Sequence, residues 1–328
     1  MRRAVLVALS AVAAVALVTF PLWTSSWESS RYATTILRDM LVLGIFALSL
    51  DVLVGVAGMP SLGHAAFFGG GAYAAGIVAQ RFGSDDLLLG LGAAMLVAAS
   101  LAFVIGLFAV RAAGIFFLML TLAFAQMVFA VAFQATELTG GSNGLAGVHR
   151  PTFAGLDFNA ADALFQLVAC VFIAVLVALW RLRSSAYGRA LAGLRENERR
   201  MRALGYDTLR LRLSAFVIAG AFAGLGGALS AYALRFVSTN DVGVSRSVEG
   251  FVSVLIGGTG TLLGPAIGAV VVLYVERVLS SAIPFSQTVL GVVFIVFVVA
   301  ARQGIVGLAR AMWARAKVSR GAMARVER

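Results

Sequence analysis

The chain has 328 residues, of which 61% are hydrophobic and only 12% are charged, and its formal net charge is +11. A soluble domain carries about 25% charged residues, so most of this surface does not face water. The arginines gather at Arg2 and Arg3, in residues 181–212 and after Arg302, as in short cytoplasmic loops of membrane proteins, and leave no basic soluble face for nucleic acid. We therefore predict one all-α transmembrane domain over residues 1–328.

Apolar runs of about 20 residues predict about eight to ten membrane-crossing helices in a polytopic bundle. The first run follows Met-Arg-Arg and is expected to stay as an uncleaved helix, with cleavage as a secretory signal as the alternative. We place the helices at residues 4–22, 37–57, 62–80, 87–110, 112–133, 161–180, 213–234, 249–262, 264–283 and 286–303.

Orientation is predicted from the basic residues. The arginine-rich loop 184–212 is expected in the cytoplasm, and the N-terminus and the basic tail 304–328 then lie there too, provided that 249–262 makes a short crossing. A re-entrant 249–262 would instead put the tail outside. The sequence thus favours a multi-pass protein of the bacterial inner membrane, in contact with lipid, with both termini cytoplasmic.

Glycine clusters at 55–76 and 257–268 lie in opposite halves of the chain. Paired, glycine-interrupted helices of this kind are typical of transporters built from two pseudo-repeated halves around a central pathway. Two residues have alternatives: His64 could simply hydrogen-bond a neighbouring helix, and Asp51, an acid deep in a predicted helix, could be the coupling residue of an ion-driven carrier. The candidate pathway residues are Asp51, Ser61, Gly63, His64, Phe67, Tyr73, Gly257 and Gly258.

A glycine-rich stretch lies in the outward loop 134–160. Glycine, serine and asparagine favour left-handed and turn conformations, so residues 139–145 predict a compact loop. The functional alternative is a periplasmic gate or docking surface formed by Gly140, Gly141, Asn143 and Gly144.

The basic loop predicts one amphipathic helix. Leu191, Leu194, Met201 and Leu204 recur at spacings that share one side of a helix, and Gly205 offers a C-terminal cap. Such a helix could lie on anionic lipid or dock in a groove of another protein. Acidic and amide groups among the cations favour the protein groove. The candidate coupling residues are Arg195, Glu196, Asn197, Glu198, Arg199, Arg200 and Gly205.

Motifs for catalysis are absent from the sequence. Gly258-x-Gly260 with Gly264 lacks the βαβ context of a dinucleotide site, and no phosphate-binding loop motif occurs. His64 and His149 are expected on opposite sides of the membrane, and Cys170 is the single cysteine, so neither metal nor disulfide chemistry is predicted. We expect a chain that is not an enzyme and binds no cofactor.

Four blocks together resemble the M-type permease of high-affinity branched-chain amino-acid ABC importers. They fall in the family's order between about residues 40 and 308. The blocks are GVAGMPSLGHAAFFGGGAY (55–73), TGGSNGL (139–145), LGY (204–206) leading into SAFVIAGAFAGLGGAL (214–229), and IGGTGTLLGPAIGA (256–269).

The resemblance implies a heterodimer with an H-type permease, two cytoplasmic ATPases that use ATP, and a periplasmic binding protein. It also implies that residues 189–207 couple this chain to an ATPase. The sequence departs from the family's pattern at two places. Met59-Pro60 stands where the family has Gln before Ser-Leu-Gly-His. The cytoplasmic loop lacks the Glu-Ala-Ala form of other importers and has Glu198 and Arg199 there instead. Permeases for urea and short amides share the blocks, and an autonomous ion-coupled transporter is the remaining alternative.

Overall fold

The computed structural model describes residues 16–21, 30–83, 85–153 and 155–282, and residues 288, 291, 292, 304, 305 and 307. Residues 16–21 are helical. The expected helix at 4–22 lies only partly within these ranges, and most of the one at 286–303 lies outside them.

The labelled elements are α2 (Ser30–Asp51), the π-helix η1 (Val52–Ala57), α3 (Ala65–Arg81), α4 (Leu87–Ala109), α5 (Ile115–Gln134), α6 (Thr136–Thr139), η2 (Gly141–Asn143), β1 (Leu145–Ala146), β2 (Thr152–Phe153), β3 (Leu156–Asp157), α7 (Ala161–Ser184), α8 (Ala186–Glu196), α9 (Glu198–Ala203), α10 (Thr208–Leu234), β4 (Phe236–Val237), η3 (Thr239–Val242), α11 (Val244–Gly257) and α12 (Gly264–Ala282).

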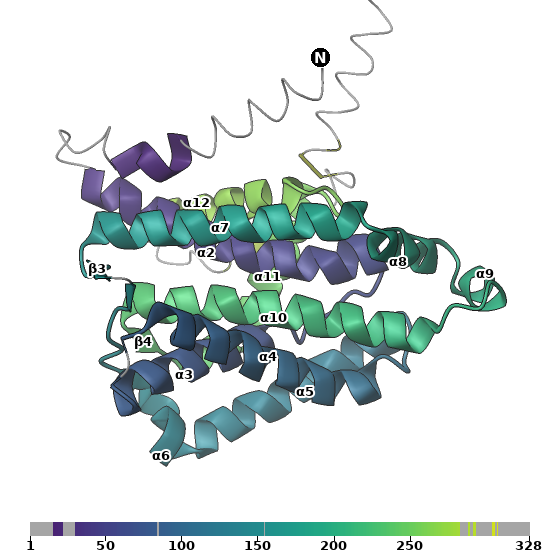
Figure 1. Ribbon diagram of the computed structural model, residues 1–328, viewed down its shortest axis with the longest axis horizontal. Coiled ribbons are helices and arrows are strands. Elements are labelled where there is room, and N and C mark those ends of the chain that lie inside the picture. The colour runs from purple at the N-terminus through teal and green to yellow at the C-terminus, as the bar shows by residue number, and fades with distance from the viewer. Residues whose placement is uncertain are drawn as a thin grey trace, which may run out of the picture.

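The long helices form a bundle with two distinct ends (Figure 1). Helices α8 and α9 lie at one, which we call the basic end, and the short strands and α6 lie at the other, which we call the loop end. There β1 pairs antiparallel with β4, and β2 pairs antiparallel with β3. These two-residue strands tie loops together and were not expected from the sequence.

Five of the described helical segments are long and apolar enough to cross a membrane. They are Tyr32–Ala57, Leu87–Ala109, Ile115–Gln134, Ala161–Ser184 and Thr208–Leu234. Helix α3 has 17 residues and α11 has 14, about 25 and 21 Å at 1.5 Å per residue, because each adjoins a break in the helical pattern. The all-α polytopic bundle predicted from the sequence is therefore confirmed.

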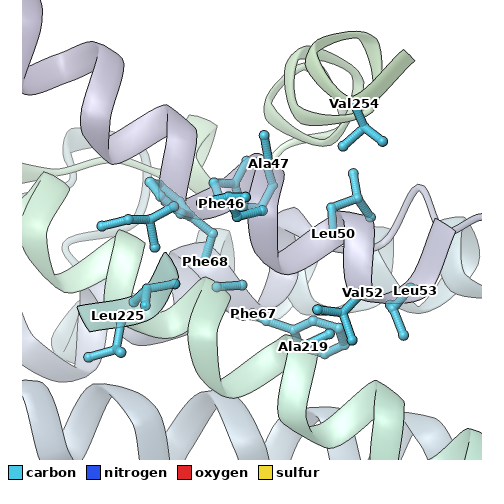
Figure 2. Close-up of a cluster of buried hydrophobic side chains, with 14 of the residues drawn as sticks. Phe46, Ala47, Leu50, Val52, Leu53, Phe67, Phe68, Ala219, Leu225 and Val254 are labelled. Atoms are coloured by element: carbon cyan, nitrogen blue, oxygen red, sulfur yellow. The ribbon is translucent and has the colours of Figure 1, made fainter. Parts of the chain in front are cut away.

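Helices α2, α3 and α10 are packed at the centre of the bundle. Figure 2 shows side chains of α2, η1, α3, α10 and α11 meeting in one apolar cluster, with Phe46 beside Phe68. Phe67 packs edge-on against Phe216 of α10, at 5.2 Å between ring centroids. Small residues permit this proximity: a Cβ on Gly71 would overlap the backbone of Gly224.

Several predicted boundaries were wrong. The helix expected from residue 37 begins at Ser30, and the one expected from residue 213 begins at Thr208. The segment expected at 249–262 is helical at Val244–Gly257, because the polar residues Arg246 and Glu249 belong to its first turns. The basic loop holds two helices rather than one, since Asn197 adopts an extended conformation (φ −159°, ψ 98°) between α8 and α9. Leu204, which follows the end of α9 at Ala203, is 67% exposed, whereas Leu191, Leu194 and Met201 are buried.

Candidate functional site: two helix breaks joined at the basic end

The first break separates α2 from α3. The α-helix ends at Asp51, one π-helical stretch follows, and Gly58 closes it in the left-handed region at φ 71°. The N–H of Met59 returns to the carbonyl of Leu53 at 2.8 Å. Proline at position 60 has no N–H and cannot continue the ladder, so residues 58–63 run without regular helix until His64 caps α3.

The second break separates α11 from α12. Gly258 and Gly260 take φ values of 107° and 72°, which side chains with a Cβ rarely adopt. The hydroxyl of Thr261 donates to the carbonyl of Gly258 at 2.7 Å, satisfying a backbone group freed by the break. A Cβ on Gly257 would overlap the carbonyl of Gly264, so glycine there lets the two helix ends meet.

Asp51 joins the two breaks. Its Oδ1 accepts a hydrogen bond from the N–H of Gly260 at 2.8 Å, and the residue is only 5% exposed. A Cβ on Gly55, one turn after Asp51, would overlap both that carboxylate and the N–H of Gly260. The site therefore pairs a buried carboxylate with backbone left unpaired by the opposite helix break.

Arg195 of α8 reaches the same place. Its Nη1 donates to the carbonyl of Gly55, and the aliphatic part of its side chain lies against Gly58, where a Cβ would come within 2.7 Å of the Arg195 Cγ. A cavity of about 460 Å³ opens here, lined in part by Gly55, Arg183, Arg189 and Arg195. One cation of the basic loop thus contacts the discontinuous backbone of the bundle directly.

Helices α8 and α9 are fixed to the bundle by polar contacts. The hydroxyl of Tyr187 lies 2.7 Å from the Ser214 hydroxyl of α10, and burial raises the pKa of the Tyr187 phenol, so it is neutral at physiological pH. Glu198 pairs with Arg202 at 2.7 Å and with Arg212 of α10.

The remaining predicted coupling residues lie on or beside these helices. Asn197 accepts a hydrogen bond from the Arg200 N–H at 3.0 Å and so caps α9. Gly205 has φ 85°, the left-handed conformation expected after a helix. Glu196, Arg199 and Arg200 are exposed to the outside of the chain.

The predicted pathway residues at 61–73 lie in the interior of the chain. Ser61 and His64 are fully buried, and Phe67 and Tyr73 are 1% and 6% exposed. The Ser49 hydroxyl of α2 donates to the Phe46 carbonyl, so His64 Nε2, 3.0 Å from the same oxygen, is assigned as the donor to Ser49.

The geometry of His64 agrees with the alternative to a pathway role, in which this side chain hydrogen-bonds a neighbouring helix. Its Nδ1 is buried without a hydrogen-bond partner among the described residues. Gly63 lies against the Thr121 backbone of α5. The fold brings the predicted pathway residues at 61–73 together. Ser61, His64 and Phe67 present no surface to a solute in this conformation, so their role in a pathway stays a prediction.

The loop at 139–145, which the sequence predicts on the outward side, is compact. Gly140, Gly141 and Gly144 all have positive φ, and the Thr139 hydroxyl accepts from the Gly141 N–H at 3.2 Å. Asn143 closes the short helix η2 before the loop joins β1. A structural role for this loop follows from these contacts, and a gating or docking role stays a prediction.

Sequence reasoning missed Gly55, Gly260 and Arg212. Gly55 and Gly260 stood within clusters already noted, but nothing in their spacing marked which glycine backbone would meet Asp51 or Arg195. Arg212 belongs to the predicted loop, yet its pairing with Glu198 depends on the fold of α9 against α10.

Apolar helices that are long enough to span a membrane, packed around two interrupted ones, define a polytopic membrane protein. The chain belongs to the family described as branched-chain amino acid transport system / permease component, whose model matches residues 32–301.

Individual relatives agree with the family. The chain is 29% identical to the high-affinity branched-chain amino acid transport system permease protein LivM of Salmonella typhimurium, covering 86% of this chain and 71% of that one. It is 27% identical to the probable LivM of Methanocaldococcus jannaschii, over 72% of this chain and 77% of the relative. An autoinducer 2 import system permease, LsrC of Yersinia pseudotuberculosis, is 31% identical over 38% of each chain. No solved structure matches.

Proposed function

We propose that this chain is the permease subunit of an ATP-binding-cassette importer that carries branched-chain amino acids inward across the bacterial plasma membrane. The family match over 32–301 and the LivM relatives support the substrate class. The observation that carries the mechanism is the contact of Arg195 with Gly55, because it connects the basic loop to the broken helices.

In this proposal the basic end faces the cytoplasm, in keeping with the positive-inside bias. Two ATPase subunits bind α8 and α9, whose outer surface presents Glu196, Arg199 and Arg200. Movement of α8 is transmitted to η1 through the contact of Arg195 with Gly55. It then reaches the α11–α12 break through the hydrogen bond between Asp51 and Gly260. This chain is not itself catalytic and binds no cofactor, and the partner subunits hydrolyse ATP.

A second permease subunit and a periplasmic binding protein complete the system. The loop end, with the compact loop at Thr139–Leu145, is the surface that we assign to the binding protein. The buried contact between Asp51 and Gly260 supports a structural role for this acid rather than the proton or ion coupling of an autonomous carrier.

The test is uptake of radiolabelled leucine, urea and a short amide by proteoliposomes. One set holds the complete complex with its binding protein, with or without internal ATP, and the other holds this chain alone under a proton or sodium gradient. The proposal predicts leucine uptake that requires ATP and the complete complex. Uptake by the chain alone along an ion gradient would reject it, and ATP-driven uptake of urea or amide instead of leucine would reject the substrate.

A further inference from the structure

A second pocket lies toward the loop end, between α2, α10, α11 and α12, far along the bundle from the Arg195 contact. Its volume is about 340 Å³, within the range of about 300–1,000 Å³ of small-molecule sites. Charged side chains from three helices line it: Asp39 of α2, Arg246 of α11, and Glu276 and Arg277 of α12. We call it the loop-end pocket.

The charges around the loop-end pocket are balanced and linked. Asp39 accepts from Arg38 at 2.8 Å through one oxygen and from Arg277 at 3.0 Å through the other. Arg246 donates to Glu249 at 2.8 Å and lies 5.0 Å from the centre of the Phe68 ring. The lining itself holds two guanidinium groups, of Arg246 and Arg277, and two carboxylates, of Asp39 and Glu276, so its formal charge prefers neither an anion nor a cation.

Such charges are expensive among membrane-spanning helices, which is why they usually mark a solute pathway. Arg277 is the most accessible, at 50% exposed, whereas Asp39 and Arg246 are 15% and 23% exposed. The Nε of Arg246 is buried without a hydrogen-bond partner among the described residues. A ligand bearing both charges would gain partners without leaving a net charge behind.

The rest of the wall is aliphatic. Val42, Ala233 and Leu273 line the same pocket, with Ser230 contributing one hydroxyl. An aliphatic wall beside a guanidinium and a carboxylate suits a molecule with a carboxylate, an ammonium group and a branched hydrocarbon side chain. Hydrogen bonds to charged partners then orient the ligand, and apolar contact supplies size selection.

We propose that the loop-end pocket is a binding site for the zwitterionic form of an aliphatic α-amino acid, with Arg277 on its carboxylate and Glu276 on its ammonium group. The inference rests on the proposed function and deepens it: the permease itself checks the solute before passing it to the helix breaks. The site is distinct from Ser61, His64 and Phe67, which are packed in the core.

The test is protection of an engineered cysteine in the complete complex, without binding protein and without nucleotide. Cys170, the single native cysteine, is first replaced in a Cys170→Ser background. Leu234→Cys places a thiol at the exposed edge of the pocket and Ser230→Cys places one deeper. Ser142→Cys, an exposed position of the loop at 139–145 outside the pocket, is the matched control. The rate of reaction with a methanethiosulfonate reagent is measured with leucine, leucinamide or 4-methylpentanoate.

Leucine at about ten times its dissociation constant should slow the reaction at positions 234 and 230 about tenfold and leave position 142 unchanged. Leucinamide lacks the carboxylate and 4-methylpentanoate lacks the ammonium group, so each should protect about tenfold less well. Arg277→Gln should erase the difference between leucine and leucinamide, and Glu276→Gln the difference between leucine and 4-methylpentanoate. A merely structural role for these residues would not produce this reciprocal pattern.

Several outcomes would overturn the inference. They are equal protection by all three compounds, protection at position 142 as well, or no protection at either pocket position. Thiols that react in the isolated chain but never in the assembled complex would instead make the pocket a subunit contact. ATP-driven leucine uptake without protection rejects the binding site in the pocket and leaves the proposed function intact. Protection without ATP-driven uptake supports the binding site and rejects the proposed function.

Discussion

The Asp51 carboxylate accepts the backbone N–H of Gly260 over 2.8 Å, a contact between residues 209 positions apart. It joins the two places where helices are interrupted and lies beside the carbonyl of Gly55 that Arg195 binds. The Asp51 side chain thus holds the two helix breaks against each other.

Asp51→Ala should destabilise the protein by about 1–3 kcal/mol, because the Gly260 N–H loses a buried partner. The measurement is thermal unfolding of the purified chain in detergent. Asp51→Asn is the matched variant, since its amide oxygen can still accept this bond. Near-normal stability and transport in Asp51→Asn support the structural role. Transport lost in Asp51→Asn at unchanged stability would indicate ion coupling through the charge.

The contact between α3 and α10 depends on glycine. A Cβ on Gly227 would overlap the carbonyl of Phe68, so Gly227→Ala should force the helices apart and lower the free energy of unfolding by about 1–3 kcal/mol. Gly92→Ala on α4 is the control, because its added Cβ meets no described atom within 4 Å apart from the neighbouring backbone of its own helix. Thermal unfolding should show a lower midpoint only for Gly227→Ala. Equal midpoints would mean that the helices do not approach this closely.

Glu198 should hold α9 on the bundle through Arg202 and Arg212. Glu198→Gln should raise the rate of amide hydrogen exchange in residues 197–205, since a part-buried Arg212 then lacks its charge partner. Asp207→Asn is the matched control, because the Asp207–Arg210 pair is exposed and asparagine still caps a helix. Unchanged exchange in Glu198→Gln would show that the two ion pairs do not order α9.

Arg199 and Arg200 are exposed on α9 and are expected to contact an ATPase. Arg199→Glu with Arg200→Glu should weaken co-purification of the ATPases about tenfold or more, because two cations become anions at one interface. Arg111→Glu with Arg210→Glu makes the same change in net charge at other exposed sites of the basic end. Equal loss of assembly in both double variants would indicate a general charge effect instead of a docking site.

The long helices could be predicted from the sequence because an apolar run of membrane length leaves little choice of structure. The helix expected at 87–110 is found at Leu87–Ala109, and the one at 161–180 at Ala161–Ser184. Errors arose where polar residues enter helices. Helix α11 begins at Val244 because Arg246 and Glu249 pair with each other, which hydropathy does not register.

The site was less predictable. The glycine clusters correctly marked two interrupted helices, but periodicity carries no information on which backbone groups meet across the bundle. The join of Asp51 to Gly260 and the pairing of Phe236–Val237 with Leu145–Ala146 are long-range contacts set by packing. Asn197 divides the basic loop because its side chain caps α9, a local choice that the leucine spacing concealed.

The most direct test of the account is the number of leucine molecules imported per ATP hydrolysed in proteoliposomes holding the complete complex. Arg195→Ala is compared with Arg189→Ala, an exposed arginine of the same helix that donates to the nearby Ser184 carbonyl at 2.8 Å. If Arg195 links α8 to the broken helices, Arg195→Ala retains assembled ATPases and ATP hydrolysis but loses most uptake, while Arg189→Ala keeps the normal ratio. An unchanged ratio in Arg195→Ala would contradict coupling through this contact.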